Sequence, residues 1–168
     1  SDNLPTKDEH DIRLCISAGE PLPSDLLARW QGTFGVDILD GLGTTEMLHI
    51  FVSNRPDEIT PGSTGRVVPG YQIRLINDNN EVCAPGEMGV LEVSGPSSAL
   101  MYWGQRQKTK DTFKGTWTRT GDNYSISEKG VMTYGGRNDD MLKVGGIYVS
   151  PFEVEAALIK HEAVLEAA

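Results

Sequence analysis

The chain has 168 residues, enough to bury a core, and its 38% hydrophobic and 23% charged residues are typical of a globular protein. The formal net charge of −9 argues against a nucleic-acid or anionic-membrane surface, because such surfaces need clustered lysine and arginine. Cys15 and Cys83 form no recognisable metal or disulfide framework, and every apolar run is too short to span a bilayer. The expected location is therefore a reducing cytoplasm, with no nucleic-acid or membrane partner.

The first sixty residues predict an α/β arrangement. The stretch "IRLCISAG" predicts a short strand, and "LPSDLLARWQGTFG" predicts a helix with Ser24 as its N-cap and Gly32 near its end. "VDILDGLG" then predicts a second strand that runs into a glycine turn. Because strand, helix, strand is the unit of a parallel sheet, we expect the two strands to pair in parallel.

From about residue 62 to 134 the pattern changes to short alternating runs separated by turns. "YQIRLIN" and "GVLEVSG" predict two strands, and Glu128 to Gly130 predict the turn of a later hairpin. Such a series indicates a small antiparallel barrel or curled sheet. After Gly136 we expect one more hairpin-like segment, and then a helix that begins with Ser150 and Pro151.

Two motifs follow predicted strands and carry polar groups. "SAGEPLP", Ser17 to Pro23, leaves its strand through small residues, so a flat base could lie against the backbone there; an ordinary strand-to-helix loop is the alternative. "DGLGTTEM", Asp40 to Met47, suits a phosphate site: glycine amides can approach oxyanions, threonines can donate hydrogen bonds, and Glu46 can hold magnesium. The same residues also suit the start of an ordinary helix.

A third motif, "WTRTGD", places Asp122 directly after a Thr-Gly step. An aspartate fixed there can accept hydrogen bonds from both hydroxyls of a ribose, as acids do in nucleotide sites of other folds. The alternative is an aspartate that only stabilises a turn.

Taken together, four motifs in this order resemble the adenylate-forming superfamily of acyl-CoA ligases, peptide-synthetase adenylation domains and beetle luciferases: "SAGEPLP", "DGLGTTE", "TRTGD" and "GRNDDMLKVGGIYVSPFEVE". Four longer stretches are similar to the benzoate-CoA ligase group: "GTTEMLHIFVSNR", "VPGYQIRL", "YWGQRQKTKDTF" and "KVGGIYVSPFEVEAAL". The resemblance implies an α+β fold in three parts. Residues 1–60 end an α/β adenylate-binding subdomain, 61–137 form an antiparallel β-barrel subdomain, and 138–168 contain a hinge and the beginning of a small mobile C-terminal domain.

The implied function is part of an ATP-dependent, AMP-forming ligase that joins a small aromatic carboxylate such as benzoate to coenzyme A with Mg²⁺. The family's phosphate-binding loop and its C-terminal lysine have no counterpart in these residues, so we expect the isolated chain to be a poor catalyst. A catalytically inactive adenylate-binding or interaction remnant is the alternative. We also expect exposed apolar surface on the α/β part, which a homodimer could cover.

The resemblance also implies roles for single residues. Thr45 binds the α-phosphate, Glu46 holds magnesium, and Lys143 completes the catalytic set. Asp122 takes the ribose hydroxyls, and Arg137 reaches the same ribose from the far side. The implied AMP- and ATP-binding residues are Gly19, Glu20, Pro21, Asp40, Gly41, Thr45, Asp122 and Arg137.

Further implied positions concern the acyl group and coenzyme A. His49 and Ile50 line the acyl pocket, and a helix there would put His49 on the same face as Glu46; a structural histidine is the alternative. Met47, Leu48 and Phe51 are expected in the core. Asp139 is the implied hinge, and Gly145 and Gly146 border the coenzyme A tunnel. Lys143 could instead be a solvated strand residue, and the two glycines could merely shape a hairpin.

Overall fold

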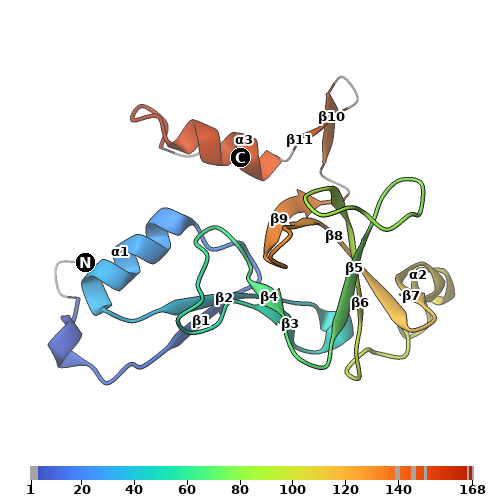
Figure 1. Ribbon diagram of the computed structural model, residues 1–168, viewed down its shortest axis with the longest axis horizontal. Coiled ribbons are helices and arrows are strands. Elements are labelled where there is room, and N and C mark those ends of the chain that lie inside the picture. The colour runs from blue at the N-terminus through green and yellow to red at the C-terminus, as the bar shows by residue number, and fades with distance from the viewer. Residues whose placement is uncertain (1–3, 139–140, 145–146, 150, 166, 168) are drawn as a thin grey trace.

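The computed structural model describes residues 4–138, 141–144, 147–149, 151–165 and 167. A short 3₁₀ helix, η1 (Lys7–Glu9), precedes a four-stranded sheet of order β1-β2-β3-β4. The strands of this first sheet are β1 (Cys15–Ala18), β2 (Ile38–Gly43), β3 (Ile50–Ser53) and β4 (Arg66–Val67). β1 and β2 are parallel, as predicted, and the other two pairs are antiparallel. In Figure 1 helix α1 (Ser24–Phe34) lies alongside the β1–β2 end of this sheet.

The predicted N-cap of α1, Ser24, was wrong by one residue, whereas the predicted end near Gly32 is confirmed. Pro23 is the N-cap and Ser24 is already the first helical residue. Gly32 lies close to the last helical residue, Phe34. Gly35 is the C-cap: its φ is +65° and its backbone N–H donates to the Gln31 carbonyl at 2.9 Å. Gly35 ends the helix because glycine adopts this left-handed conformation without a Cβ clash.

The second sheet has five strands and confirms the predicted antiparallel sheet as a half-barrel. Its order is β5-β6-β8-β7, and β9 pairs with the second half of β8. Helix α2 (Arg106–Thr112) leads into β7 and lies at the far end of this sheet in Figure 1. The five strands are β5 (Gln72–Ile76), β6 (Met88–Ser94), β7 (Phe113–Lys114), β8 (Trp117–Ile126) and β9 (Met132–Arg137).

The C-terminal elements lie along one side of the molecule, at the top of Figure 1. The strands β10 (Leu142–Val144) and β11 (Ile147–Val149) form the expected antiparallel pair, and α3 (Pro151–Ile159) begins at the expected proline. Ser150 lies outside the described residues. Across the described part of the chain, no helix has the length and apolar character needed to cross a membrane.

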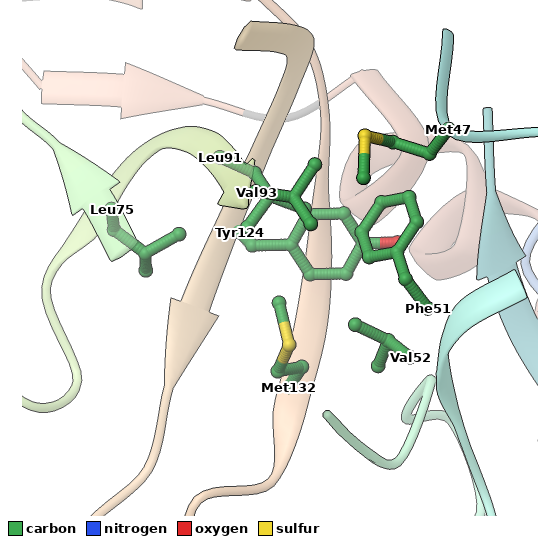
Figure 2. Packing of buried hydrophobic residues seen from close by; sticks show 8 residues of the cluster. All are labelled: Met47, Phe51, Val52, Leu75, Leu91, Val93, Tyr124 and Met132. Carbon is green, nitrogen blue, oxygen red and sulfur yellow. The ribbon is translucent and has the colours of Figure 1, made fainter. Parts of the chain in front are cut away.

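The core joins the two sheets, as Figure 2 shows. Met47 and Phe51 are fully buried, which confirms two of the three predicted core positions near η2 (Thr45–Met47). Leu48 was wrongly assigned to the core: η2 ends after one turn, Leu48 takes a positive φ of 68°, and 81% of the residue is exposed. The buried cluster consists of Met47, Phe51, Val52, Leu75, Leu91, Val93, Tyr124 and Met132.

The first sheet also has an exposed apolar face, as the sequence predicted. β1 is an edge strand, and its Ile16 is 66% exposed. Ile12, Leu14 and Leu26 nearby are also exposed. The apolar side chains of this region are therefore less completely covered than those at the junction of the two sheets.

Candidate functional site

A cavity of about 610 Å³ lies where the loop after β1, the end of β2, η2 and the strands β8 and β9 meet. Residues far apart in the sequence reach it from both sheets. Every residue that the sequence analysis assigned to the nucleotide and the metal lines this cavity: Gly19, Glu20, Pro21, Asp40, Gly41, Thr45, Glu46, Asp122 and Arg137. The fold thus brings the three polar motifs of the main sheets together.

The end of β2 approaches the start of β3 closely. A Cβ on Gly43 would lie 2.8 Å from the carbonyl oxygen of His49, so this position has room only for glycine. The chain then turns through η2, which carries Thr45 and Glu46 into the cavity. Because η2 is a single 3₁₀ turn, His49 does not follow Glu46 along a helical face, and that geometric expectation was wrong.

Asp40 is a buried carboxylate with an unsatisfied oxygen. The residue is 6% exposed, its Oδ2 accepts a long 3.5 Å hydrogen bond from the Leu22 backbone N–H, and its buried Oδ1 has no hydrogen-bond partner. Burial raises the pKa of this carboxyl from 3.8 to about 6, although backbone hydrogen bonds act in the opposite direction. A ligand N–H donor in the cavity would satisfy the free oxygen.

The "TGD" segment is a bulge in β8. The register with β6 shifts between the Val90↔Asn123 and Glu92↔Arg119 pairs, so β8 has extra residues opposite Leu91. Gly121 takes a φ of +81°, and the Thr120 hydroxyl donates to the Leu91 carbonyl at 3.1 Å. The same hydroxyl oxygen accepts the Asp122 backbone N–H at 3.1 Å. The bulge thereby holds the Asp122 side chain at the cavity.

Asp122 is buried and paired with a cation. Arg137 lies opposite it in the β8–β9 register, and the Arg137 Nη1 to Asp122 Oδ1 distance is 3.0 Å. Burial raises the pKa of the Asp122 carboxyl, and the charge and hydrogen bond of Arg137 partly offset this effect. The structure pairs the two side chains directly, because neighbouring strands bring them side by side. The position of Arg137 on the far side of the ribose stays a prediction.

Glu46 is held as a carboxylate by its surroundings. Its Oε1 accepts a hydrogen bond from the Tyr102 hydroxyl, and its backbone carbonyl accepts one from Ala99 N–H at 2.7 Å. Burial acts to raise the pKa of Glu46, but this pKa is lowered overall, because the hydrogen bond from Tyr102 and smaller effects of the Glu46 backbone, Thr44 and the Lys108 charge together outweigh burial. The side chain is therefore ionised at neutral pH and faces the cavity.

The donor set fits a magnesium ion that enters with a nucleotide. Within the ranges that the structure describes, no group of three or more histidine, cysteine or acidic side chains could hold a metal alone. Magnesium is commonly held by one or two carboxylates together with substrate phosphates, and the ionised Glu46 in this cavity supplies such a carboxylate.

The remaining predicted site residues are placed less completely. The Ile50 side chain lies over Gly41, with Cδ1 and Cγ2 each 3.1 Å from the position of a Cβ there. His49 is exposed and does not line the cavity. Lys143 belongs to β10. Asp139, Gly145 and Gly146 lie outside the described residues.

Several cavity residues were not singled out from the sequence. Tyr102 and Lys108 come from the stretch around α2, and Arg119 from β8, where buried Glu92 lies 3.9 Å from its Nη1. A tyrosine followed by several basic residues in "YWGQRQKTK" was the available signal. The sequence alone did not reveal which of those side chains points inward.

The chain matches the family model described as AMP-binding enzyme over residues 2–103. It is 59% identical over 167 residues to a benzoate–CoA ligase of Thauera aromatica, across 99% of this chain and 32% of that protein. A solved benzoate CoA ligase from Burkholderia xenovorans LB400 is 51% identical with a TM-score of 0.91, across 99% of this chain and 33% of that one. The anthranilate CoA ligase AuaEII, solved with anthranoyl-AMP, is 49% identical with a TM-score of 0.86, across 92% of this chain and 30% of that one.

The chain therefore belongs to the AMP-binding enzyme family. Within that family it is homologous to benzoate–CoA ligases, which confirms the resemblance that the motifs indicated. It spans about a third of the length of these relatives.

Proposed function

We propose that this chain supplies the adenylate-binding part of an ATP-dependent, AMP-forming ligase that joins an aryl carboxylate, such as benzoate, to coenzyme A. The observation that carries the proposal is the convergence of all nine predicted nucleotide and metal residues on one cavity. The relatives named as benzoate and anthranilate CoA ligases support an aromatic acid as the substrate.

The nucleotide would be held at three points. Asp40, with its unsatisfied Oδ1, offers an acceptor for the exocyclic amino group of adenine. Asp122 offers its carboxylate to the two ribose hydroxyls, and its partner Arg137 favours the charged form of that carboxylate. Thr45 would donate its hydroxyl to the α-phosphate. These assignments use the chemistry of each group and its place on the cavity wall.

Two chemical steps follow. In the first, a carboxylate oxygen of the aryl acid attacks the α-phosphorus of ATP, and the bond to the bridging oxygen of pyrophosphate breaks. In the second, the coenzyme A thiol gives its proton to solvent, its sulfur bonds to the acyl carbon, and AMP leaves. Glu46 would hold Mg²⁺, which supplies positive charge against the phosphates when bound. Thr45 would orient the phosphate under attack.

The C-terminal elements would serve the second step. The motif resemblance assigns Asp139 to a hinge of a small mobile domain, Lys143 on β10 to the thioester-forming arrangement, and Gly145 and Gly146 to the pantetheine path. The motif resemblance assigns His49 and Ile50 to the border of the aryl group; Ile50 packs over Gly41, which lines the cavity.

The test is a calorimetric titration of the purified chain with a non-hydrolysable benzoyl-adenylate analogue, with a medium-chain fatty-acyl analogue for comparison. We expect binding that favours the benzoyl analogue. Circular dichroism establishes that the sample is folded. If a folded sample binds neither analogue, the chain does not by itself form an adenylate site and the proposal fails for this molecule.

A further inference from the structure

The segment 95–105, which connects β6 to α2, is fastened to η2 at three points. Ala99 N–H donates to the Glu46 carbonyl at 2.7 Å, and the Ser97 hydroxyl donates to the Met47 carbonyl at 2.6 Å. The Tyr102 hydroxyl donates to the Glu46 carboxylate. These contacts join residues about fifty positions apart, so the segment is packed onto the part of the cavity wall that carries Glu46.

Tyr102 points inward, unlike its neighbours. Leu100 and Trp103 are 88% and 91% exposed, and Met101 is also largely exposed, whereas Tyr102 is half-buried and lines the cavity. Its backbone N–H donates to the Thr109 hydroxyl oxygen at 3.0 Å, which ties the tyrosine to α2. An inward tyrosine between exposed apolar residues indicates that its hydroxyl contact, rather than general burial, determines its orientation.

Two further contacts hold the Tyr102 ring. The Phe113 ring lies 5.6 Å away between centroids, and the Lys108 Nζ lies 4.3 Å from the Tyr102 centroid. An ammonium over a phenol ring is an attractive cation–π contact. Lys108 also lines the cavity, and within the described ranges it forms no salt bridge, unlike Arg119 and Arg137. Its charge is therefore free to act on the ring and on nearby Glu46.

We propose that Tyr102 is a positioning residue that aims the Glu46 carboxylate at a nucleotide-bound Mg²⁺, and that Lys108 holds the Tyr102 ring in place. This inference rests on the proposed function, because it takes Glu46 as the magnesium-binding group. Carboxylates that bind metals are themselves oriented by hydrogen bonds, and loss of such a partner typically weakens metal affinity 10–100-fold. Tyr102 supplies that hydrogen bond from a segment that resemblance had not linked to the metal.

The test compares ATP affinity with and without magnesium. Calorimetry on the 168-residue chain measures ATP binding in EDTA and in excess Mg²⁺. We expect Tyr102→Phe to lower the gain in affinity that magnesium gives by about tenfold, a larger change than the one it causes in EDTA. Tyr71→Phe is the matched control, because the Tyr71 hydroxyl contacts Ser97 at 2.8 Å and not Glu46.

Lys108 has its own pair of variants. Lys108→Met removes the cation over the ring, and we expect a smaller loss of the magnesium gain than in Tyr102→Phe. Lys108→Arg keeps a cation that can stack on the ring, and we expect it to restore most of that gain. A purely structural role for Tyr102 would weaken ATP binding equally in both buffers, and that result overturns the proposal.

A ligand-free measurement separates this proposal from the proposed function. Urea unfolding of Tyr102→Phe, Glu46→Ala and the double variant forms a double-mutant cycle. We expect the double variant to lose less stability than the sum of the single losses, because both variants remove the same hydrogen bond. Additive losses overturn the positioning role. If the wild-type chain binds ATP in neither buffer but the losses are coupled, the proposed function fails while the Tyr102–Glu46 contact stands.

Discussion

Asp40 on β2 and Asp122 on β8 line the same cavity from different sheets and are buried to similar degrees, with 6% and 7% of each residue exposed. Asp122 has a guanidinium 3.0 Å from its carboxylate. Asp40 forms no salt bridge within the described ranges, and its Oδ1 has no hydrogen-bond partner. Burial alone therefore does not define an acidic site. A nearby cation favours the charged form of a buried carboxylate, whereas a buried carboxylate without a cation can still accept a hydrogen bond from a ligand.

The difference is a property of strand pairing. Asp122 and Arg137 are register partners on β8 and β9, so the sheet itself supplies the cation. Asp40 pairs in register with Ser17 of β1, which offers no charge. Burial of the Asp40 carboxyl costs desolvation free energy. We expect a hydrogen bond from a ligand N–H in the cavity to offset this cost.

The largest expected effect on ligand binding comes from replacing Asp122, the acid paired with Arg137. Asp122→Ala is expected to weaken binding of the benzoyl-adenylate analogue by more than about 100-fold, because the two hydrogen bonds from the ribose hydroxyls to a carboxylate contribute roughly 1.5–3 kcal/mol each. Calorimetry measures the change. Asp25→Ala, which removes an exposed acid on α1, is the control. An Asp122→Ala protein that binds as tightly as the wild type would remove Asp122 from the site.

The second prediction concerns the acid without a cation. The pKa of Asp40 is about 6 in the folded chain and 3.8 as its ordinary value, so the folded state loses stability as pH rises through this window. Asp40→Asn removes this charge. We expect its thermal midpoint to exceed that of the wild type by about 5 °C at pH 7.5 and the gap to close near pH 4. An equal difference in thermal midpoint at both pH values would show that the charge on Asp40 does not destabilise the folded state.

The smallest effect is expected for the cation itself. Arg137 is half exposed, with 51% of its side chain accessible, so its ion pair is partly screened by solvent. Arg137→Met is expected to raise the pKa of Asp122 further and to lower the thermal midpoint at pH 7.5 by about 2 °C. Arg137→Lys, which keeps the charge, serves as the control. A loss equal to that of a fully buried pair would mean that solvent does not reach this contact.

Local pattern was sufficient for much of the fold. The apolar runs predicted β1 and β2 and their parallel pairing, and the alternating runs predicted β5, β6 and the β8–β9 hairpin. The end of α1 near Gly32 was predicted, but its N-cap was placed one residue late, because Ser24 is a common N-cap type and the structure makes Pro23 the N-cap. Leu48 was missed because the length of η2 is decided by the return of the chain into β3, which no helical pattern shows.

Some residues of the candidate site could likewise be predicted from the sequence, and others could not. Motif order was sufficient to select Asp40, Glu46, Asp122 and Arg137, because these residues lie in short stretches of distinctive composition. Tyr102 and Lys108 could not be selected, because their stretch contains several aromatic and basic side chains and only packing decides which of them faces Glu46.

Local order along the chain was enough to identify the family, several of the strands and nine of the residues that line the cavity. The contacts of each buried charged side chain, in contrast, depend on the tertiary structure. Arg137 reaches Asp122 through the β8–β9 register, Tyr102 reaches Glu46 across more than fifty residues, and Asp40 is left with an unsatisfied oxygen. Such pairings depend on distances between strands that come together only when the two sheets pack, and for that reason no local pattern contains them.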